Sequence, residues 1–345
     1  MHVPDGFIDA PASAVTGVVA AGALAVSLRG ARRELDERTA PLAGLVAAFI
    51  FAVQMLNFPV AAGTSGHLLG GALAAILVGP CTGVLCVSVV LLMQGILFAD
   101  GGLTALGVNI TDMAVVTTVV SYALFRGLVK VLPRRRRSVT VASFVAALVS
   151  VPAAAVAFTL IYAVGGTTDV ALSKVATAMI GVHVLIGIGE AAITSLTVGA
   201  VIAVRPDLVH GARGLQQRLK LRVNGELVDA PATPVPVAAR TSRRGLWITG
   251  LVTSLVLAGF VSFYASANPD GLEKVAHDKG IDKKAERHAS DGSPLAGYGV
   301  KDISDARLSG GLAGVIGVGV TVVGGSTVFW VVARRRRTSE PAEAA

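Results

Sequence analysis

Residues 67–98 read HLLGGALAAILVGPCTGVLCVSVVLLMQGILF and contain no Asp, Glu, Lys or Arg. A hydrocarbon layer about 30 Å thick needs about 20 consecutive apolar residues to cross it as a helix. The run is longer than one crossing requires, and Gly79-Pro80 lies near its middle. It therefore predicts two adjacent membrane spans, of which the first is short and glycine-rich and begins as a re-entrant segment.

The composition of the whole chain agrees with a membrane protein. Of 345 residues, 53% are hydrophobic and 15% are charged, and the mean hydropathy is +0.69. Soluble domains carry about 25% charged residues. The net charge of +8 is gathered in particular loops, so it indicates orientation in a membrane rather than binding to nucleic acid. Cys81 and Cys86 form no CxxC pair, and we interpret them as small buried residues.

The predicted fold class is an all-α polytopic membrane protein with about nine spans. A seven-span bundle is followed by a two-helix hairpin with an extracytoplasmic loop. The nine apolar runs are residues 12–28, 41–57, 66–80, 83–99, 105–131, 138–164, 174–204, 246–266 and 309–333.

Positive charges predict the orientation of these spans. Loops 58–65, 100–104 and 165–173 contain no Lys or Arg, whereas arginines follow the first, fifth, seventh and ninth spans. Cytoplasmic loops are enriched in Lys and Arg. The alternation predicts an outside N-terminus and an inside C-terminus. Because the arginines follow the first span instead of preceding it, we do not expect a cleaved signal peptide.

The sequence predicts two membrane units joined by a linker. Residues 1–204 form the seven-span unit, and residues 205–245 form a basic cytoplasmic linker with Pro231, Pro234 and Pro236. Residues 246–345 form the two-span unit, whose external loop is 267–308. From residue 269 to residue 307 this loop holds seven Lys or Arg against eight Asp or Glu, a near-neutral balance that fits an external module.

The chemistry-bearing residues lie at the predicted outer face. Met1-His2 offers three nitrogens within one chelate: the α-amine, the His2 amide nitrogen and the His2 imidazole. His67 lies in a glycine-rich break on the same side and can supply a fourth. A planar set of nitrogen ligands is typical of Ni(II) or Cu(II). The alternative interpretation of His67 is a histidine that is hydrogen-bonded at the membrane interface.

Three polar residues near this region are candidates to hydrogen-bond the ligands and orient the imidazoles. They are Ser65, Asn109 and Asp112. Turn and helix-cap chemistry is an equally good explanation for the polar residues around position 109. Within span 174–204, His183 and Glu190 are two helical turns apart and share a face. A structural polar contact or a subunit interface is favoured there over a proton relay or a second metal stop.

At this point five segments are identified as similar to a known family. MHVPDGF (1–7), GTSGHLLGGALAAILVGP (63–80), DGGLTALGVN (100–109) and HVLIGIGE (183–190) resemble the CbiM/NikM substrate-specific components of energy-coupling factor transporters for cobalt and nickel. NPDGLEKVAHDKGI (268–281) resembles the PDGLE domain of CbiN- or NikN-like subunits, here fused behind the seven-span unit.

The resemblance implies a seven-helix substrate-binding component of the bacterial-type cell membrane. Its metal ligands would be the Met1 amine, the amide nitrogen and ring of His2, and the ring of His67. The transported ion would be Ni(II) or Co(II), with no other cofactor. A CbiQ/NikQ-like coupling subunit and CbiO/NikO-like ATPases would be the partners, in agreement with the absence of a G-x-x-x-x-G-K-[ST] motif.

Two other functions remain open from the residues alone. A stand-alone metal channel or secondary transporter predicts inverted repeats or several charged residues along the spans. An intramembrane enzyme would use His67, His183 and Glu190 together, although the sequence has neither the His-Glu-x-x-His nor the Gly-x-Ser-x-Gly signature. The transporter subunit, which is not an enzyme itself, is the expected function.

Overall fold

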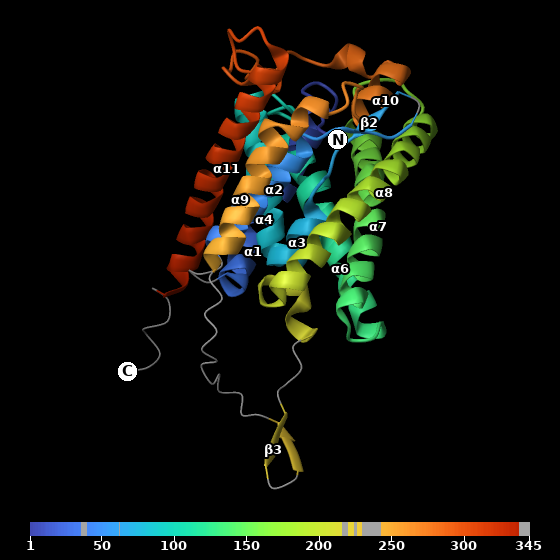
Figure 1. The fold of residues 1–345 in the computed structure, drawn as a ribbon. Helices are drawn as coiled ribbons and strands as arrows, with labels where there is room; N and C mark the ends of the chain where they lie inside the picture. Colours follow the sequence, from blue (N-terminus) through green and yellow to red (C-terminus); the bar gives the residue numbers. More distant parts are fainter. Residues whose placement is uncertain (36–39, 62, 216–219, 224–225, 230–242, 338–345) are drawn as a thin grey trace.

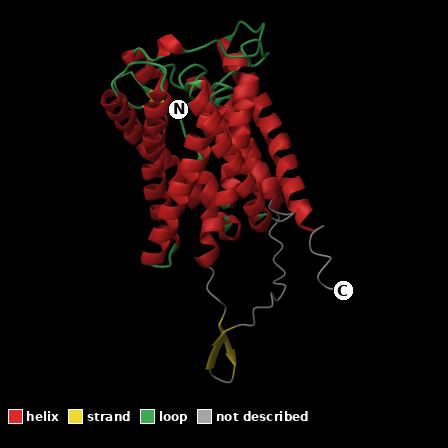
Figure 2. Ribbon diagram, turned by 180° about the vertical axis from the view of Figure 1, so that it is seen from behind, coloured by secondary structure: helices red, strands yellow, loops and turns green. Residues whose placement is uncertain are grey.

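The computed structural model describes residues 1–35, 40–61, 63–215, 220–223, 226–229 and 243–337. It is a bundle of helices that run between two ends of the molecule (Figure 1). Met1 and the loop that carries α10 lie at one end, whereas α9 begins and α11 ends at the other (Figures 1 and 2). The arrangement agrees with the predicted topology, in which the N-terminus and loop 267–308 share the outer side.

The longer helices form the bundle, and the short elements connect them. In chain order they are α1 Ala10–Glu34, α2 Ala40–Gln54, β1 Phe58–Pro59, β2 Ser65–Gly66, α3 Gly71–Val78, α4 Pro80–Met93, the π-helical η1 Gln94–Phe98, α5 Leu106–Asn109, the π-helical η2 Ile110–Val116, α6 Thr117–Val131, α7 Arg136–Gly165, α8 Leu172–Val204, η3 Pro206–Leu208, η4 His210–Leu215, β3 Lys220–Val223, β4 Glu226–Asp229, α9 Arg243–Gly259, η5 Val261–Tyr264, α10 Gly271–Lys279, η6 Asp282–Lys284, η7 Ala296–Tyr298 and α11 Ala306–Arg337.

Seven of the nine predicted spans are confirmed as long apolar helices in the described part of the chain. The second, α2, is a shorter apolar helix of 15 residues. The third span, over 66–80, is expected to begin as a re-entrant segment, and the structure agrees, because residues 67–70 are not helical and α3 has only eight residues. Eight residues are about 12 Å long, so the chain enters this crossing as extended backbone and completes it as a helix.

Side chains from distant helices explain why α3 is short. The backbone N–H groups of Leu69 and Gly70 donate to the two carboxylate oxygens of Glu190, at 2.6 and 3.1 Å. A buried helix start must find acceptors for such groups, and a carboxylate at this end also favours the helix dipole. At the other end of α3, Glu34 accepts the N–H groups of Cys81 and Thr82, at 3.1 and 2.7 Å, where α4 begins.

The linker contains a short antiparallel pair, β3 with β4, which the sequence analysis did not predict. The other pair, β1 with β2, joins Phe58 to Gly66 and Pro59 to Ser65. Both are local ribbons within an all-α protein (Figure 2). The prolines predicted to mark the linker, Pro231, Pro234 and Pro236, lie outside the described residues.

Small residues bring the C-terminal hairpin against the bundle. A Cβ added to Gly44 of α2 would lie 2.2 Å from the Ser326 hydroxyl of α11, and one added to Gly317 would lie 2.2 Å from the Phe51 ring. Close helix approach through small residues is how helices associate in lipid. The hairpin α9–α11 is therefore packed on α2 along its length (Figure 1).

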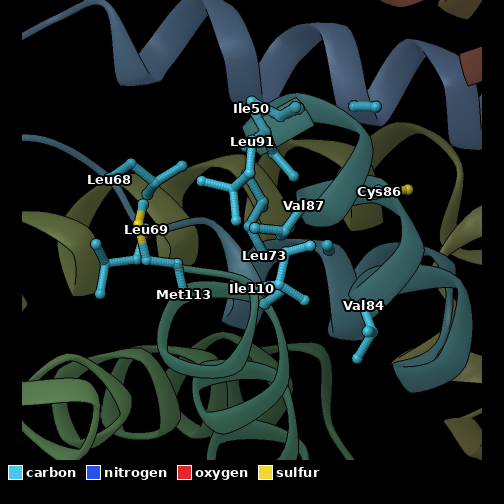
Figure 3. Close-up of a cluster of buried hydrophobic side chains, with 14 of the residues drawn as sticks. Ile50, Leu68, Leu69, Leu73, Val84, Cys86, Val87, Leu91, Ile110 and Met113 are labelled. Carbon is cyan, nitrogen blue, oxygen red and sulfur yellow. The ribbon is translucent and has the colours of Figure 1, made fainter. Parts of the chain in front are cut away.

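An apolar core lies directly beneath the outer end. Leu68 and Leu69, which follow His67 in the chain, are fully buried with Leu73 and Met113 (Figure 3). Ile50 of α2 and Leu91 of α4 belong to the same core. Burial of Leu68 and Leu69 in this core fixes the position of His67, which directly precedes them in the chain.

Candidate metal centre

The first four residues form an irregular segment that leads into a turn at Asp5 and Gly6, and this segment is held beneath the outer loop. The Val3 N–H donates to Asn109 Oδ1 at 2.7 Å, and Asn109 Nδ2 donates to the Val3 carbonyl at 3.1 Å. The Gly102 N–H donates to the same carbonyl at 2.8 Å. Asn109 thus binds the backbone next to His2, and within the described residues it makes no hydrogen bond to either imidazole. That Asn109 orients the metal ligands stays a prediction. Any such effect would act through the backbone of Val3, next to His2.

Asp5 fixes the other end of this segment. Its carboxylate accepts the N–H and the hydroxyl of Thr104 at 2.8 and 2.5 Å, and its carbonyl accepts the Glu286 N–H at 2.9 Å. A Cβ at Gly102 would lie 2.3 Å from the Asp5 nitrogen. The DGG turn therefore needs glycine, because the N-terminal segment lies against its backbone.

The α-amine of Met1 and the ring of His67 face each other. Met1 N and His67 Nε2 are 2.7 Å apart in a buried contact. His67 Nδ1 lies 3.0 Å from the Leu68 carbonyl. Since a carbonyl only accepts, Nδ1 carries the proton, and the Nε2 lone pair points at the Met1 nitrogen. This is the tautomer that a metal-binding Nε2 requires.

His2 lies beside His67 in the same cluster. Its ring stacks on the His67 ring, with centroids 5.1 Å apart, and its side chain is 8% exposed. His2 Nε2 lies 3.1 Å from Gln94 Oε1 and donates to it, which leaves Nδ1 as the lone-pair nitrogen. Burial lowers the pKa of His2 to about 4, despite the opposing charge of Asp100, so the ring is neutral near pH 7.

Asp270, which the sequence marks only as part of the PDGLE motif, completes the cluster. Its Oδ2 lies 2.7 Å from Met1 N and 3.6 Å from His67 Nε2. Burial alone would raise the pKa of this carboxyl, but the charge of the α-ammonium holds it well below its usual range. Ligand atoms of His2, His67 and Asp270 all lie within 4.8 Å of one another.

Each residue of the PDGLE motif has a place in this geometry. Asp270 caps α10, because its Oδ1 accepts the Glu273 N–H at 2.8 Å. In return, the Asp270 N–H donates to the Glu273 carboxylate at 3.0 Å. The Pro269 carbonyl accepts the Ser65 N–H at 2.9 Å. A Cβ at Gly271 would lie 3.0 Å or less from two side chains of α8, and Leu272 is buried.

Ser65 contacts this motif instead of the imidazoles. Its hydroxyl donates to the Asn268 carbonyl at 2.7 Å and to the Pro269 carbonyl at 3.2 Å. Ser65 is two residues before His67 in the chain, and Pro269 is directly before Asp270. The contact therefore ties the loop of one ligand candidate to the loop of the other.

A cavity of about 530 Å³ leads to the cluster. It lies between the seven-span unit and the hairpin, and its lining includes His2, His67 and Asp270. Asp100 also lines it; its Oδ2 accepts the Tyr298 hydroxyl at 2.6 Å, and its Oδ1 lies 3.4 Å from His2 Nδ1. The outer loop therefore covers the cluster and leaves a polar route to it.

Of the other polar residues named from the sequence, Asp112 and Glu190 lie outside this cluster, and His183 lies beside it. The carboxylate of Asp112 is buried, and neither oxygen has a hydrogen-bond partner in the described part of the chain. The predicted bond from Asp112 to a ligand ring is therefore not formed here. Glu190 caps α3, as described above. His183 donates from Nδ1 to the Met179 carbonyl at 2.7 Å, and its Nε2 has no hydrogen-bond partner in the described part of the chain. The His183 ring lines a small pocket together with Met1, His67 and Asp270, whereas Glu190 binds the backbone and does not join His67 and His183 in one catalytic constellation.

The cluster has the chemistry of a transition-metal site. Neutral imidazole nitrogens, an amine and a carboxylate oxygen are all ligands for first-row divalent metals. The fold and this cluster define a class, that of multi-pass helical membrane proteins with a candidate transition-metal site under a cover at one end of the bundle.

Comparison with known families agrees with this class and makes it specific. The chain belongs to the CbiM family, described as the cobalt uptake substrate-specific transmembrane region, whose model matches residues 2–208. The PDGLE domain matches residues 244–334. The resemblance inferred from the sequence motifs is thereby confirmed.

Similar proteins have names that refer to metal transport. A Haloquadratum walsbyi protein whose name places it among metal transport proteins is 39% identical over 209 residues, 61% of this chain and 93% of that protein. A fused nickel transport protein, NikMN, of Rhodobacter capsulatus is 43% identical over 125 residues, 36% of each chain. A crystal structure of a truncated transition metal transporter is 28% identical and covers 59% of this chain and 99% of its own, with a TM-score of 0.52.

Proposed function

We propose that this protein is the substrate-binding membrane subunit of an energy-coupling factor importer. It captures Ni(II) or Co(II) at the outer face of a bacterial-type cell membrane for ATP-driven uptake. The observation that carries the proposal is the 2.7 Å contact between the Met1 amine and His67 Nε2, with the His2 ring stacked beside it.

The proposed ligands are the Met1 amine, the His2 amide nitrogen, His2 Nδ1 and His67 Nε2. Bonds from such ligands to a divalent metal are about 2.1 Å long, so neighbouring ligands at right angles are about 3 Å apart. The Met1–His67 spacing fits that value. A planar nitrogen set favours Ni(II) over Zn(II) or Mg(II), and Co(II) remains a candidate because geometry, more than affinity, selects among these metals.

Metal binding in this scheme replaces protons. The amine and the amide nitrogen must each lose a proton before they ligate, whereas the His2 and His67 rings already present lone pairs. Asp100 and Asp270 place negative charge beside the incoming dication. The buried surroundings of the cluster then hold the ion until the ligand set is broken or reoriented.

Energy would come from other subunits. The sequence has no Walker A motif, so ATP hydrolysis is assigned to separate CbiO/NikO-like ATPases. A CbiQ/NikQ-like coupling subunit would contact the exposed apolar surface, of which α1 is one part, since Val15, Val18 and Val26 are more than 60% exposed. We propose that these partners tilt the whole bundle to release the metal inward.

The decisive experiment compares two forms of the full-length protein that differ only at the N-terminus. One form begins at Met1 with a free amine, and the other carries a short Gly-Ser extension. Intact-mass spectrometry establishes each terminus, and metal content after Ni(II) or Co(II) loading is the readout. We expect about one metal per native chain and none in the extended chain. Equal metal content in both forms contradicts the proposal.

A further inference from the structure

The PDGLE aspartate has two carboxylate oxygens with different surroundings. Oδ1 accepts the Glu273 N–H and thereby begins helix α10. Oδ2 points away from that helix toward Met1 N, at 2.7 Å, and His67 Nε2, at 3.6 Å. The helix cap therefore requires only one of the two oxygens.

The position of Oδ2 fits that of a metal ligand. Ligands at right angles on one divalent metal are about 3 Å apart, and Oδ2 lies near that distance from both nitrogens. The four proposed nitrogens would occupy one plane. An atom at this spacing from two of them can lie above or below the plane, where an axial ligand binds.

The charge of the cluster also favours a carboxylate ligand. Because the amine and the amide nitrogen each lose a proton as the dication binds, the positive charge that the ammonium carries in this structure is kept, now on the metal, in a region with little solvent. A buried charge needs an opposite charge beside it, and the Asp270 side chain is 11% exposed. The carboxylate that faces the ammonium in this structure is placed to face the metal.

Docking of the hairpin does not depend on this ion pair. Ser65 holds the loop through Asn268 and Pro269, and Gly271 lets α10 approach α8. Helices α9 and α11 pack along α2. These contacts already set the position of the hairpin, and the contact between Asp270 and Met1 is additional to them.

We propose that Asp270 Oδ2 is a fifth, axial ligand that the fused hairpin supplies to the metal. This inference rests on the proposed function, since it adds a carboxylate to the same four nitrogens. An oxygen above the plane makes the site square-pyramidal, a geometry more favourable to Co(II) than a bare planar set. Asp270 would then help to determine which metal is retained.

The test is X-ray absorption at the nickel edge on full-length protein with a free N-terminus. Planar four-coordinate Ni(II) gives an edge feature that an axial ligand removes. We expect the feature to be absent in wild type and present in Asp270→Ser, because serine keeps an N-cap hydroxyl but has no second oxygen. Asp270→Ala is the second variant, and Glu273→Ala, which breaks the capping box and keeps Asp270, is the matched control.

Metal titrations accompany the spectra. The affinity for Co(II) should fall about tenfold or more in both Asp270 variants and stay at the wild-type value in Glu273→Ala. A planar spectrum in the wild type overturns the axial ligand even if neither Asp270 variant folds. Metal binding by Asp270→Ser that is as tight as in wild type, or tighter, also overturns the proposal. That result would show that the ion pair between Asp270 and Met1 only holds the outer loop in place. A wild type that binds neither metal contradicts the proposed function itself.

Discussion

Two buried polar clusters in this protein differ in what their side chains face. The outer cluster contains Met1, His2, His67 and Asp270, and the second cluster contains Glu190 of α8 with the backbone at the start of α3. Glu190 accepts two backbone N–H groups. In the outer cluster an amine, a ring nitrogen and a carboxylate face one another. Side chains that satisfy the backbone support the fold, whereas side chains that converge can hold a ligand.

The strongest test of this contrast removes the His67 ring. His67→Ala should lower nickel and cobalt affinity about a thousandfold or more, because a ligand is lost outright and the amine loses its neighbour. His277→Ala, at a 78% exposed histidine of the outer loop that pairs with Asp282, is the matched control and should bind like wild type. Isothermal titration of both purified proteins measures the difference. An equal loss of binding in both variants would contradict a specific role of His67 as a ligand.

Acidification should weaken metal binding through the amine and the amide. The pKa of His2, lowered to about 4 by burial, keeps this ring neutral between pH 8 and pH 6. Asp270 also stays charged, because its pKa lies well below the usual range. Apparent affinity should therefore fall about tenfold per pH unit for each proton released. Titration in buffers of different ionisation enthalpy counts those protons, and a flat profile contradicts amine ligation.

Asn109→Ala tests whether the backbone clamp on Val3 places His2. Both hydrogen bonds to Val3 would be lost. Residues that orient metal ligands typically contribute 10–100-fold to affinity, and we expect a loss at the lower end of about that range. The Gly102 bond to Val3 remains, so binding should be weakened and not abolished. An affinity equal to that of wild type would show that the clamp is dispensable.

Glu190→Gln should separate stability from metal affinity. Glutamine has one acceptor oxygen in place of two, so the Leu69 or the Gly70 N–H would be left unpaired. An unsatisfied buried group costs about 1–3 kcal/mol, and thermal unfolding in detergent should reveal the loss. Metal affinity of the folded protein should change less than in Asn109→Ala. A collapse of affinity without loss of stability would move Glu190 into the site.

The smallest effect is expected at Asp112. Its carboxylate has no hydrogen-bond partner in the described part of the chain, so Asp112→Asn removes no contact that the structure contains. Nickel affinity should stay within about twofold, and stability should stay equal or rise, because a buried unpaired carboxylate is unfavourable. A marked loss of affinity would support the earlier prediction that Asp112 orients a ligand.

The sequence was sufficient for the residues whose chemistry is local. Met1-His2 carries its donors in one dipeptide, and His67 stands out in an apolar region. Asp270 was missed as a neighbour of these residues because its Pro-Asp-Gly context is also ordinary turn chemistry, and nothing in the sequence gives its distance to Met1. Gln94 was missed as well, although an amide at the end of an apolar run was an available signal.

The fold was predictable where hydropathy alone decides it. Long apolar runs gave seven helices that the structure contains within the described residues. The crossing at 66–80 departed from that pattern because Glu190, 120 residues further along the chain, accepts the N–H groups that a longer helix would have bonded internally. Hydropathy averages over a window and carries no information about such a partner.

Burial of Met1 has a consequence for biogenesis. The chain's first residue is 3% exposed and lies against Asp270, which the ribosome adds 269 positions later. At about 5–20 residues per second, the beginning of the chain waits on the order of tens of seconds for its cover. The order of synthesis therefore leaves Met1 and His2 uncovered until the loop that carries Asp270 has been made.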